Sequence, residues 1–242
     1  MSPPASDDEP QVTAVAGPGD GNNQRGNNNE GNGDGAGDHY FSGGPTSTSR
    51  PRRVRLDLPD RTIHLDTDAG VFSPDRVDPG TKLLLMELPE LTGGPVVDLG
   101  CGYGPIACTV ALRHPELAVV AVDVNPRARE LCARNAAATG VDVTVLDPRH
   151  AHGLARIGTI VSNPPIRIGK AALHDLLIDW LGRLHPTGHA YLVVNKHLGA
   201  DSLARWLAER GHRVERLASR QGYRVLSVAA TGGAHRTDGG DR

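Results

Sequence analysis

The sequence is poor in the features that mark a membrane protein or a secreted protein. None of its apolar runs approaches the length of a membrane-spanning helix, and its first residues lack the apolar core of a signal peptide. Its three cysteines, Cys101, Cys108 and Cys132, are odd in number and form no Cys-x-x-Cys pair. We therefore expect a soluble, cytoplasmic protein with reduced thiols and, because suitably spaced ligands are lacking, no bound metal.

Two stretches of the chain contain almost no apolar side chains. Residues 20–44 are mostly Gly, Asn and Asp, and the last residues have a similar composition. Such segments bury too little apolar surface to offset their ordering entropy. We therefore predict a disordered acidic tail over residues 1–50, a hairpin over 51–69, a folded domain over 70–230 and a disordered tail over 231–242.

The formal net charge of −2 hides an uneven distribution of charge. Residues 1–49 contain seven acidic residues and one basic residue, which leaves 25 Lys and Arg against 21 Asp and Glu in the rest of the chain. The folded part is therefore mildly basic. This balance permits a polyanionic partner without requiring one, because strong nucleic-acid binders usually carry a more concentrated basic stripe.

Short apolar segments alternate with amphipathic ones along the folded part. We predict strands over residues 96–99, 118–122, 141–146, 159–162, 190–194, 214–218 and 224–229, and helices over 79–88, 104–113, 126–138, 170–184 and 201–210. This alternation is typical of a doubly wound sheet with helices on both faces. The predicted fold is α/β, a Rossmann-like seven-stranded sheet that is mostly parallel and has an antiparallel last strand.

A glycine-rich run, Asp98-Leu-Gly-Cys-Gly-Tyr-Gly104, follows the first buried strand and opens a helix. Gly100, Gly102 and Gly104 let the backbone turn tightly and approach a ligand closely. Pro105 stands where a dinucleotide-binding fingerprint has its third glycine, so a pyrophosphate fits poorly. Asp98 at the strand end suits a cationic amino-acid group, and S-adenosylmethionine carries both an ammonium and a sulfonium.

Further polar side chains follow the next two predicted strands. Asp123 ends its strand about twenty residues after the glycines and is placed to accept both ribose hydroxyls, with Asn125 beside it. Asp147 ends the following strand and could accept a hydrogen bond from an adenine amine. Each acid could instead cap a helix or face water, but their shared position at the carboxyl ends of strands favours binding.

Ser162-Asn163-Pro164-Pro165 follows the fourth predicted strand of the sheet. The two prolines stiffen the loop, and the Asn163 side chain and the Pro164 carbonyl offer two hydrogen-bond acceptors. Two acceptors can hold the hydrogens of an exocyclic amine and direct its lone pair toward a methyl group. Alone, such a tripeptide is more often a rigid turn, but its position near the glycine run favours nitrogen methylation.

These segments resemble the class I S-adenosylmethionine-dependent methyltransferases. The segment from Phe72 to Leu85 is similar to the lead-in of the small-domain methyltransferase family, typified by the guanine-N2 methyltransferases of small-subunit ribosomal RNA, and the resemblance covers about residues 70–230. It implies that Asp78 and Gly80 lie near the cofactor. It also implies that the glycine loop, including Cys101, binds the methionine part, and that the Asn-Pro-Pro loop holds the target guanine beside the cofactor.

The resemblance further implies ribosomal RNA, or the small ribosomal subunit, as the partner. The family usually places an aromatic side chain after the two prolines, where this chain has Ile166, so stacking worth about 1–3 kcal/mol is lost. Arg167, Lys170 and Lys196 flank the expected pocket, and we hypothesise that they contact RNA phosphates. An ordinary solvated surface is the competing interpretation of these three side chains.

Three other functions remain open at this point. The same chemistry could act on an adenine amine or on a protein glutamine amide, although relatives of those kinds also tend to carry an aromatic after the prolines. A catalytically inactive module that binds the cofactor or RNA is the third alternative, but the intact Asn163 disfavours it. The glycine spacing argues against a nicotinamide-dependent oxidoreductase.

Overall fold

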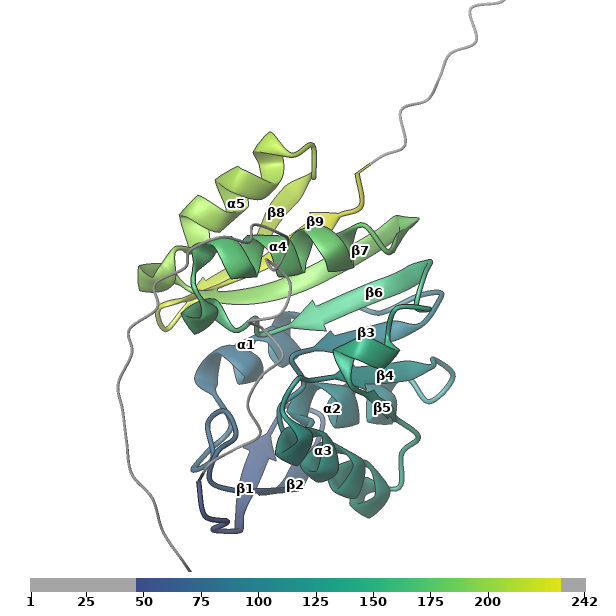
Figure 1. Cartoon of the computed structure of the whole chain (residues 1–242), viewed down its shortest axis with the longest axis vertical. Coiled ribbons are helices and arrows are strands. Elements are labelled where there is room, and N and C mark those ends of the chain that lie inside the picture. Colours follow the sequence, from purple (N-terminus) through teal and green to yellow (C-terminus); the bar gives the residue numbers. More distant parts are fainter. Residues whose placement is uncertain (1–46, 232–242) are drawn as a thin grey trace, which may run out of the picture. The chain divides into compact units, whose positions relative to one another are not determined.

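The computed structural model describes residues 47–231, so the disorder predicted for the two tails concerns residues that lie almost wholly outside this range. The strands are β1 (Arg52–Asp57), β2 (Thr62–Thr67), β3 (Val96–Leu99), β4 (Val119–Val122), β5 (Thr144–Leu146), β6 (Ile157–Ser162), β7 (Leu184–Asn195), β8 (Val214–Arg220) and β9 (Tyr223–Ala229) (Figure 1). The α-helices are α1 (Pro79–Glu87), α2 (Pro105–Arg113), α3 (Pro126–Thr139), α4 (Lys170–Leu181) and α5 (Ala200–Glu209). Three short 3₁₀ helices, η1 (Pro148–His150), η2 (Ile166–Ile168) and η3 (Lys196–Leu198), lie in the connecting loops.

The central sheet has seven strands in the order β5-β4-β3-β6-β7-β9-β8. The strands from β5 to β7 pair in parallel, and β9 pairs antiparallel with both β7 and β8. This arrangement confirms the predicted doubly wound sheet with an antiparallel last strand. The chain winds outward from β3 in one direction and from β6 in the other, so β3 and β6 form the switch point. Ligands bind at the carboxyl ends of the strands beside such a point.

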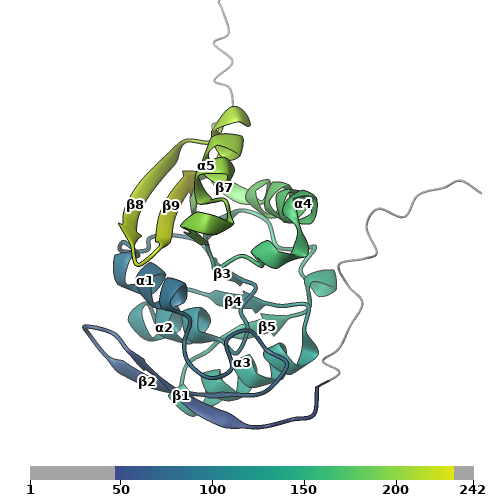
Figure 2. The ribbon, with the colours of Figure 1, turned by 90° about the vertical axis from the view of Figure 1, so that its left-hand side faces the viewer.

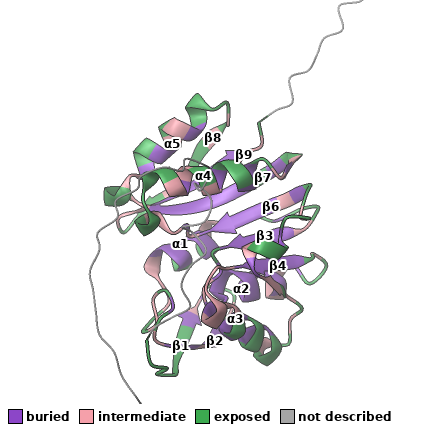
Figure 3. Cartoon of the chain, in the orientation of Figure 1, coloured by how far each residue is buried: buried purple, intermediate pink, exposed green. Residues whose placement is uncertain are grey.

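Both faces of the sheet are covered by helices. Val96 packs in one core with the β1–β2 hairpin, α1, α2 and α3, whereas Val97 packs in a second core with α4 and α5. Alternate residues of each strand therefore enter opposite cores, and the four residues of β4 are all buried. Figure 3 shows the buried strands between helices whose outer sides are exposed. A parallel sheet covered on both faces explains why these strands read as continuous apolar runs.

Local capping determines where two helices on the first face begin and end. Asp78 caps α1 by accepting a hydrogen bond from the Thr81 N–H at 3.1 Å, and a proline occupies the first turn. Asn125 caps α3 in the same way through the Arg127 N–H at 3.0 Å. Gly140, with a φ of 72°, ends α3 in the left-handed conformation. These ends agree with the predicted ones to within a residue or two.

The β1–β2 hairpin is a separate two-stranded sheet that packs on helices. Asn135 of α3 accepts from the Asp66 N–H and donates to the Asp66 carbonyl, both at 2.8 Å. The same amide donates to the Tyr103 carbonyl in the glycine loop at 2.8 Å. In Figure 2 the hairpin runs alongside α2 and α3. It therefore covers the helical layer and does not extend an edge of the central sheet.

The predicted helix over residues 170–184 is too long. α4 ends at Leu181, and Leu184 begins β7 by pairing with Ile157, so this strand starts six residues before the predicted one. Pro186 and Gly188 lie within β7, where a sequence pattern reads them as breakers, and a register shift between Ile157 and Thr159 accommodates them. Within residues 47–231, no helix combines the length and the apolar character needed to cross a membrane.

Candidate active site

A cavity of about 440 Å³ opens at the carboxyl ends of the parallel strands, beside the switch point. Its polar lining comes from Asp78, Asp123, Asn125, Asn163, Arg167, Asn195 and Tyr223. Its apolar lining includes Phe72, Leu99, Val122, Ala128, Leu176 and Trp180. The volume lies within the range of small-molecule sites, and a few polar groups converge on a mostly apolar wall. The cavity is therefore the candidate active site.

The glycine loop forms one wall of this cavity. Gly100 and Gly102 line it, whereas Cys101 and Gly104 do not. The Gly100 and Cys101 N–H groups both donate to the Val122 carbonyl, at 2.8 and 3.0 Å, so the loop is tied to the end of β4. Cys101 is 3% exposed, and hydrogen bonding to a neighbouring thiol together with burial raises its thiol pKa. The Cys101 thiol therefore supports the loop from behind and has no thiolate character.

Asp123 connects the glycine loop to the next helix. One carboxylate oxygen accepts from the Gly102 N–H and the other from the Asn125 N–H, each at 2.8 Å. Burial raises the pKa of this carboxyl group, and the two N–H donors oppose that rise. Asn125 also lines the cavity and donates to the Gly70 carbonyl at 2.8 Å. The unused lone pairs of Asp123 are available for the predicted ribose hydroxyls.

Asp98 does not line the cavity, although the sequence places it at a strand end. Its carboxyl group is 1% exposed and accepts from the Ala107 N–H in the first turns of α2 at 2.9 Å. Its Oδ1 atom has no hydrogen-bond partner among the described residues. Burial raises the pKa of Asp98 to about 8, and the nearby Asp123 carboxylate adds to the rise. The side chain therefore lies behind the glycine loop, where it braces the start of α2.

Asp147 is also outside the cavity lining. Its carboxylate accepts from the Arg149 guanidinium at 2.9 and 3.0 Å and lies 3.1 Å from Arg129. These hydrogen bonds hold the pKa of Asp147 below its usual range. Because both oxygens are engaged by arginines, the carboxylate orders the loop in which its neighbour Pro148 reaches the cavity. In this geometry the Asp147 carboxylate is not positioned to accept the predicted hydrogen bond from an adenine amine.

The Asn-Pro-Pro loop lines the same cavity and lies next to the glycine loop, because the Ser162 hydroxyl directly before it donates to the Leu99 carbonyl at 2.6 Å. The Asn163 Nδ2 atom donates to Asp78 Oδ1 and to Thr81 Oγ1, each at 2.9 Å, which leaves the Asn163 Oδ1 atom as its free acceptor. The Pro164 carbonyl accepts from the Ile166 N–H at 2.8 Å across Pro165, whose φ of −74° and ψ of 73° form an inverse γ-turn. One lone pair of that carbonyl remains. The predicted pair of acceptors is thus present beside the glycine loop.

Some residues that line the cavity were not predicted from the sequence. Asn195 lies at the carboxyl end of β7, the same signal that identified Asp123, so strand position could have found it. Tyr223 pairs with Asn195 across the sheet but begins an antiparallel strand, a position that carries no such signal. Gly80 does not line the cavity. A Cβ atom on Gly80 would lie 2.6 Å from the Tyr223 ring, so glycine permits the close approach of that ring.

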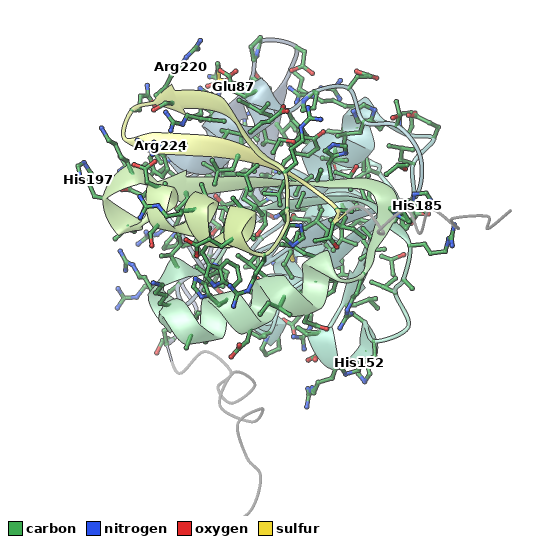
Figure 4. The ribbon with its side chains drawn as sticks, turned by 90° about the horizontal axis from the view of Figure 1, so that it is seen from above. Glu87, His152, His185, His197, Arg220 and Arg224 are labelled. Atoms are coloured by element: carbon green, nitrogen blue, oxygen red, sulfur yellow. The ribbon has the colours of Figure 1, made fainter. Side chains whose placement is uncertain are left out.

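The three predicted RNA-contacting residues lie in segments that border the cavity. Arg167 of η2 lines it, whereas Lys170 and Lys196 are exposed and lie outside the lining. In Figure 4, His197, the neighbour of Lys196, lies at the opposite side of the molecule from His185, which follows the first residue of β7. The cavity, Lys196 and His197 therefore share the carboxyl edge of the sheet.

The fold and this cavity together define a class I S-adenosylmethionine-dependent methyltransferase. A glycine loop after β3, an acid after β4 and an Asn-Pro-Pro loop after β6 surround one site at the switch point of a doubly wound sheet. Residues 62–227 match the family model described as methyltransferase small domain. The chain therefore belongs to this family, as its resemblance to small-domain methyltransferases predicted.

Individual relatives differ in how much of their length the chain covers. It is 32% identical over 197 residues to the Bacillus subtilis protein YbxB, which is uncharacterized, covering 79% of this chain and 98% of that one. It is 34% identical over 192 residues to ribosomal RNA small subunit methyltransferase C of Shewanella amazonensis, covering 76% of this chain and 54% of the relative. The chain thus spans about half the length of that methyltransferase.

The chain also matches about half the length of a methyltransferase whose structure is solved. The T. thermophilus 16S rRNA N2 G1207 methyltransferase (RsmC), in complex with AdoMet and guanosine, matches with a TM-score of 0.66 and 26% identity. The match covers 76% of this chain and 52% of that protein. A methyltransferase from Pyrococcus furiosus, with a TM-score of 0.56 and 18% identity, shares the fold.

Proposed function

We propose that this chain transfers a methyl group from S-adenosylmethionine to the exocyclic amine of a guanine in ribosomal RNA. The observation that carries the proposal is that the glycine loop and Asn163 line a single cavity. The likeness to a 16S rRNA methyltransferase solved with AdoMet and guanosine supports both ligands. The basic residues beside the cavity support an RNA partner.

The residues in and around the glycine loop fit the cofactor. Gly100 and Gly102 present backbone to the cavity, and a Cβ atom on Gly102 would meet nothing within 4 Å, so there is room for a ligand. Asp123 and Asn125 supply acceptors for the ribose, and Val122, Ala128 and their apolar neighbours enclose a flat ring. When bound, S-adenosylmethionine supplies an electrophilic methyl group on its sulfonium.

The residues of the Asn-Pro-Pro loop orient the nucleophile. The Asn163 Oδ1 atom and the remaining lone pair of the Pro164 carbonyl accept the two hydrogens of an amine. Holding the amine in this way directs its lone pair into the cavity without a prior deprotonation. Orientation of this kind lowers a barrier by about 7–11 kcal/mol in well-aligned systems, which makes positioning the main contribution of the chain.

Ile166 and Phe72 cover the target base. Ile166 is half-buried and lines the cavity, and Phe72, which is 59% exposed, lines it as well. Phe72 supplies an aromatic ring that position 166 lacks. The polar Asn195 and Tyr223 complete the lining near Asn163, where a guanine would present its polar edge. The cavity therefore suits a flat base that carries an amine.

Labelled methyl transfer tests the proposal directly. The purified chain is incubated with methyl-labelled S-adenosylmethionine and, separately, with naked ribosomal RNA, small ribosomal subunits and bulk protein, and the products are digested and separated. We expect the label in N2-methylguanosine. Label in methyladenosine or in glutamine would replace the proposed substrate. The absence of any transfer, together with heat on titration with S-adenosylhomocysteine, would indicate an inactive cofactor-binding module.

A further inference from the structure

We infer that Asp78 and Thr81 are positioning residues that fix the Asn163 side chain with its oxygen toward the cavity, so that only a hydrogen-bond donor is accepted as the methylated group. The inference rests on the proposed function and narrows its substrate class. It assigns a role to the start of α1, which the sequence reasoning placed only near the cofactor. The Asn163 contacts with this helix carry the inference.

The orientation of the Asn163 amide follows from the chemistry of its two partners. Both hydrogens of Nδ2 are used, one on Asp78 Oδ1 and one on Thr81 Oγ1, each at 2.9 Å. A half-turn of the amide would place Oδ1 against the Asp78 carboxylate, which accepts hydrogen bonds and cannot donate one. The flipped state would thus set two acceptors against each other. The carboxylate therefore selects the orientation in which Asn163 presents an acceptor to the cavity.

Asp78 is itself held from two directions. Its Oδ1 atom caps α1 by accepting from the Thr81 N–H at 3.1 Å, and its Oδ2 atom accepts from the Tyr223 hydroxyl at 3.3 Å. Burial and the neighbouring Asp78 carboxylate raise the pKa of Tyr223, so the hydroxyl keeps the proton that it donates. Gly80 leaves room for the Tyr223 ring against the first turn of α1. Tyr223 of β9 thereby braces the Asn-Pro-Pro loop through Asp78 and α1.

The fixed acceptor restricts what can react. A group that carries hydrogens, such as an exocyclic amine or an amide, can donate to the Asn163 oxygen. A bare acceptor such as the N7 atom of guanine meets the same oxygen with repulsion. The site therefore selects amine nitrogens by the direction of its hydrogen bonds as well as by shape. A guanine presents both kinds of nitrogen, which makes it a suitable probe of this selection.

Thr81→Val tests the inference because it removes one acceptor while conserving shape at a side chain that is 3% exposed. One Asn163 N–H then loses its partner, so we expect kcat to fall roughly tenfold while the KM for S-adenosylmethionine stays within about twofold. Tyr223→Phe should lower kcat less, because it acts through Asp78. Thr109→Val is the matched control: its buried hydroxyl donates to the Pro105 carbonyl at 2.7 Å, away from Asn163. We expect the control to keep the wild-type kcat.

A second measurement on the full chain does not depend on turnover. In ¹⁵N spectra, the Asn163 side-chain amide is identified by its loss in Asn163→Ala, and its hydrogens should exchange slowly in the wild type and faster in Thr81→Val. Rapid exchange in the wild type, or a kcat for Thr81→Val equal to that of the control, would overturn the inference. If the Asn163 amide hydrogens exchange slowly in a wild-type protein that methylates no RNA, the inferred role of Asp78 and Thr81 stands and the proposed function is wrong.

Discussion

The proposed chemistry depends strongly on one atom, the side-chain oxygen of Asn163. The side-chain nitrogen is fully used in contacts with Asp78 and Thr81 at the start of α1, which leaves the oxygen as the acceptor that Asn163 offers to the cavity. The cofactor contacts proposed for Asp123 and Asn125 come from a different strand and do not involve this amide. Binding of the cofactor and orientation of the nucleophile are therefore separable by substitution.

Replacement of Asn163 by Ala should separate cofactor binding from orientation of the nucleophile. We expect Asn163→Ala to lower methyl transfer on the order of 100-fold or more, because the amine loses an oriented acceptor. The affinity for S-adenosylhomocysteine should stay within about twofold, as measured by titration calorimetry. Activity close to that of the wild type would show that the amine is held by other groups. A parallel loss of cofactor affinity would show that the two functions are not separate.

Asp98 should make the stability of the folded chain depend on pH. Its carboxyl pKa is raised from 3.8 to about 8 in the folded state. Its contribution to stability is therefore complete below about pH 4 and is lost as the pH rises through 8, because the unfolded chain releases the proton first. The slope is at most about 1.4 kcal/mol per pH unit.

The variant Asp98→Asn should remove this dependence. We expect its free energy of unfolding, measured in urea without cofactor, to change less between pH 5 and 8 than that of the wild type. Asp142→Asn serves as the control, since Asp142 is exposed in the loop before β5. An unchanged slope in Asp98→Asn would mean that the buried carboxyl group is ionised throughout this range.

At the scale of elements, the glycine loop and α3 lie in direct contact. Gly104 caps α2 in the left-handed region, with a φ of 90°. A Cβ atom there would lie 2.7 Å from the Cys132 sulfur and 3.3 Å from its Cα. Gly140, which ends α3, has a φ of 72°, and a Cβ atom on it would meet nothing within 4 Å. The two glycines therefore share a conformational requirement and differ in the space around them.

The substitutions Gly104→Ala and Gly140→Ala separate conformation from packing. Gly140→Ala should cost about 1 kcal/mol, the penalty of the left-handed region alone. Gly104→Ala should cost at least about 1 kcal/mol more, because the loop or α3 must move, and cofactor affinity should fall with it. Urea unfolding and calorimetry measure the two effects. Equal losses in the two variants would show that the contact with Cys132 relaxes freely.

At the scale of the molecule, basic side chains lie at both edges of the sheet, and the cavity opens at one of these edges. Arg167 and Lys170 follow the Asn-Pro-Pro loop at the carboxyl edge. Arg156 and Arg213 lie at the opposite edge, directly before β6 and β8. Phosphate contacts should depend on the first pair only, because the substrate reaches the cavity from the carboxyl edge.

A double substitution tests this distribution of charge. Arg167→Ala with Lys170→Ala should weaken RNA binding and reduce the slope of log affinity against log salt by about 1.4, the value for two single-strand phosphate contacts. The control pair, Arg156→Ala with Arg213→Ala, should leave the slope close to that of the wild type. Filter binding over a series of salt concentrations measures both. An equal change in the two pairs would assign the effect to net charge.

Much of the fold could be predicted from local patterns. Buried strands alternating with helices, together with the rule that parallel connections are right-handed, lead to one doubly wound sheet. Capping residues such as Asp78, Asn125 and Gly140 mark helix ends because their effects reach only a few residues along the chain. The end of α4 was missed because Leu184 owes its place in β7 to pairing with Ile157, a contact between segments far apart in sequence.

By itself, the sequence determined the doubly wound sheet and the three loops that surround the cavity, because the alternation of strands and helices places the carboxyl ends of parallel strands at one edge. Only the tertiary structure decided what each polar side chain does there. Asp98 lies behind its loop, and Asp147 pairs with two arginines. Asp78 and Thr81 instead hold Asn163, and Tyr223 donates to Asp78. Hydrogen-bond partners depend on which segments, distant in sequence, come into contact in the fold, and a local sequence pattern carries no information about those contacts.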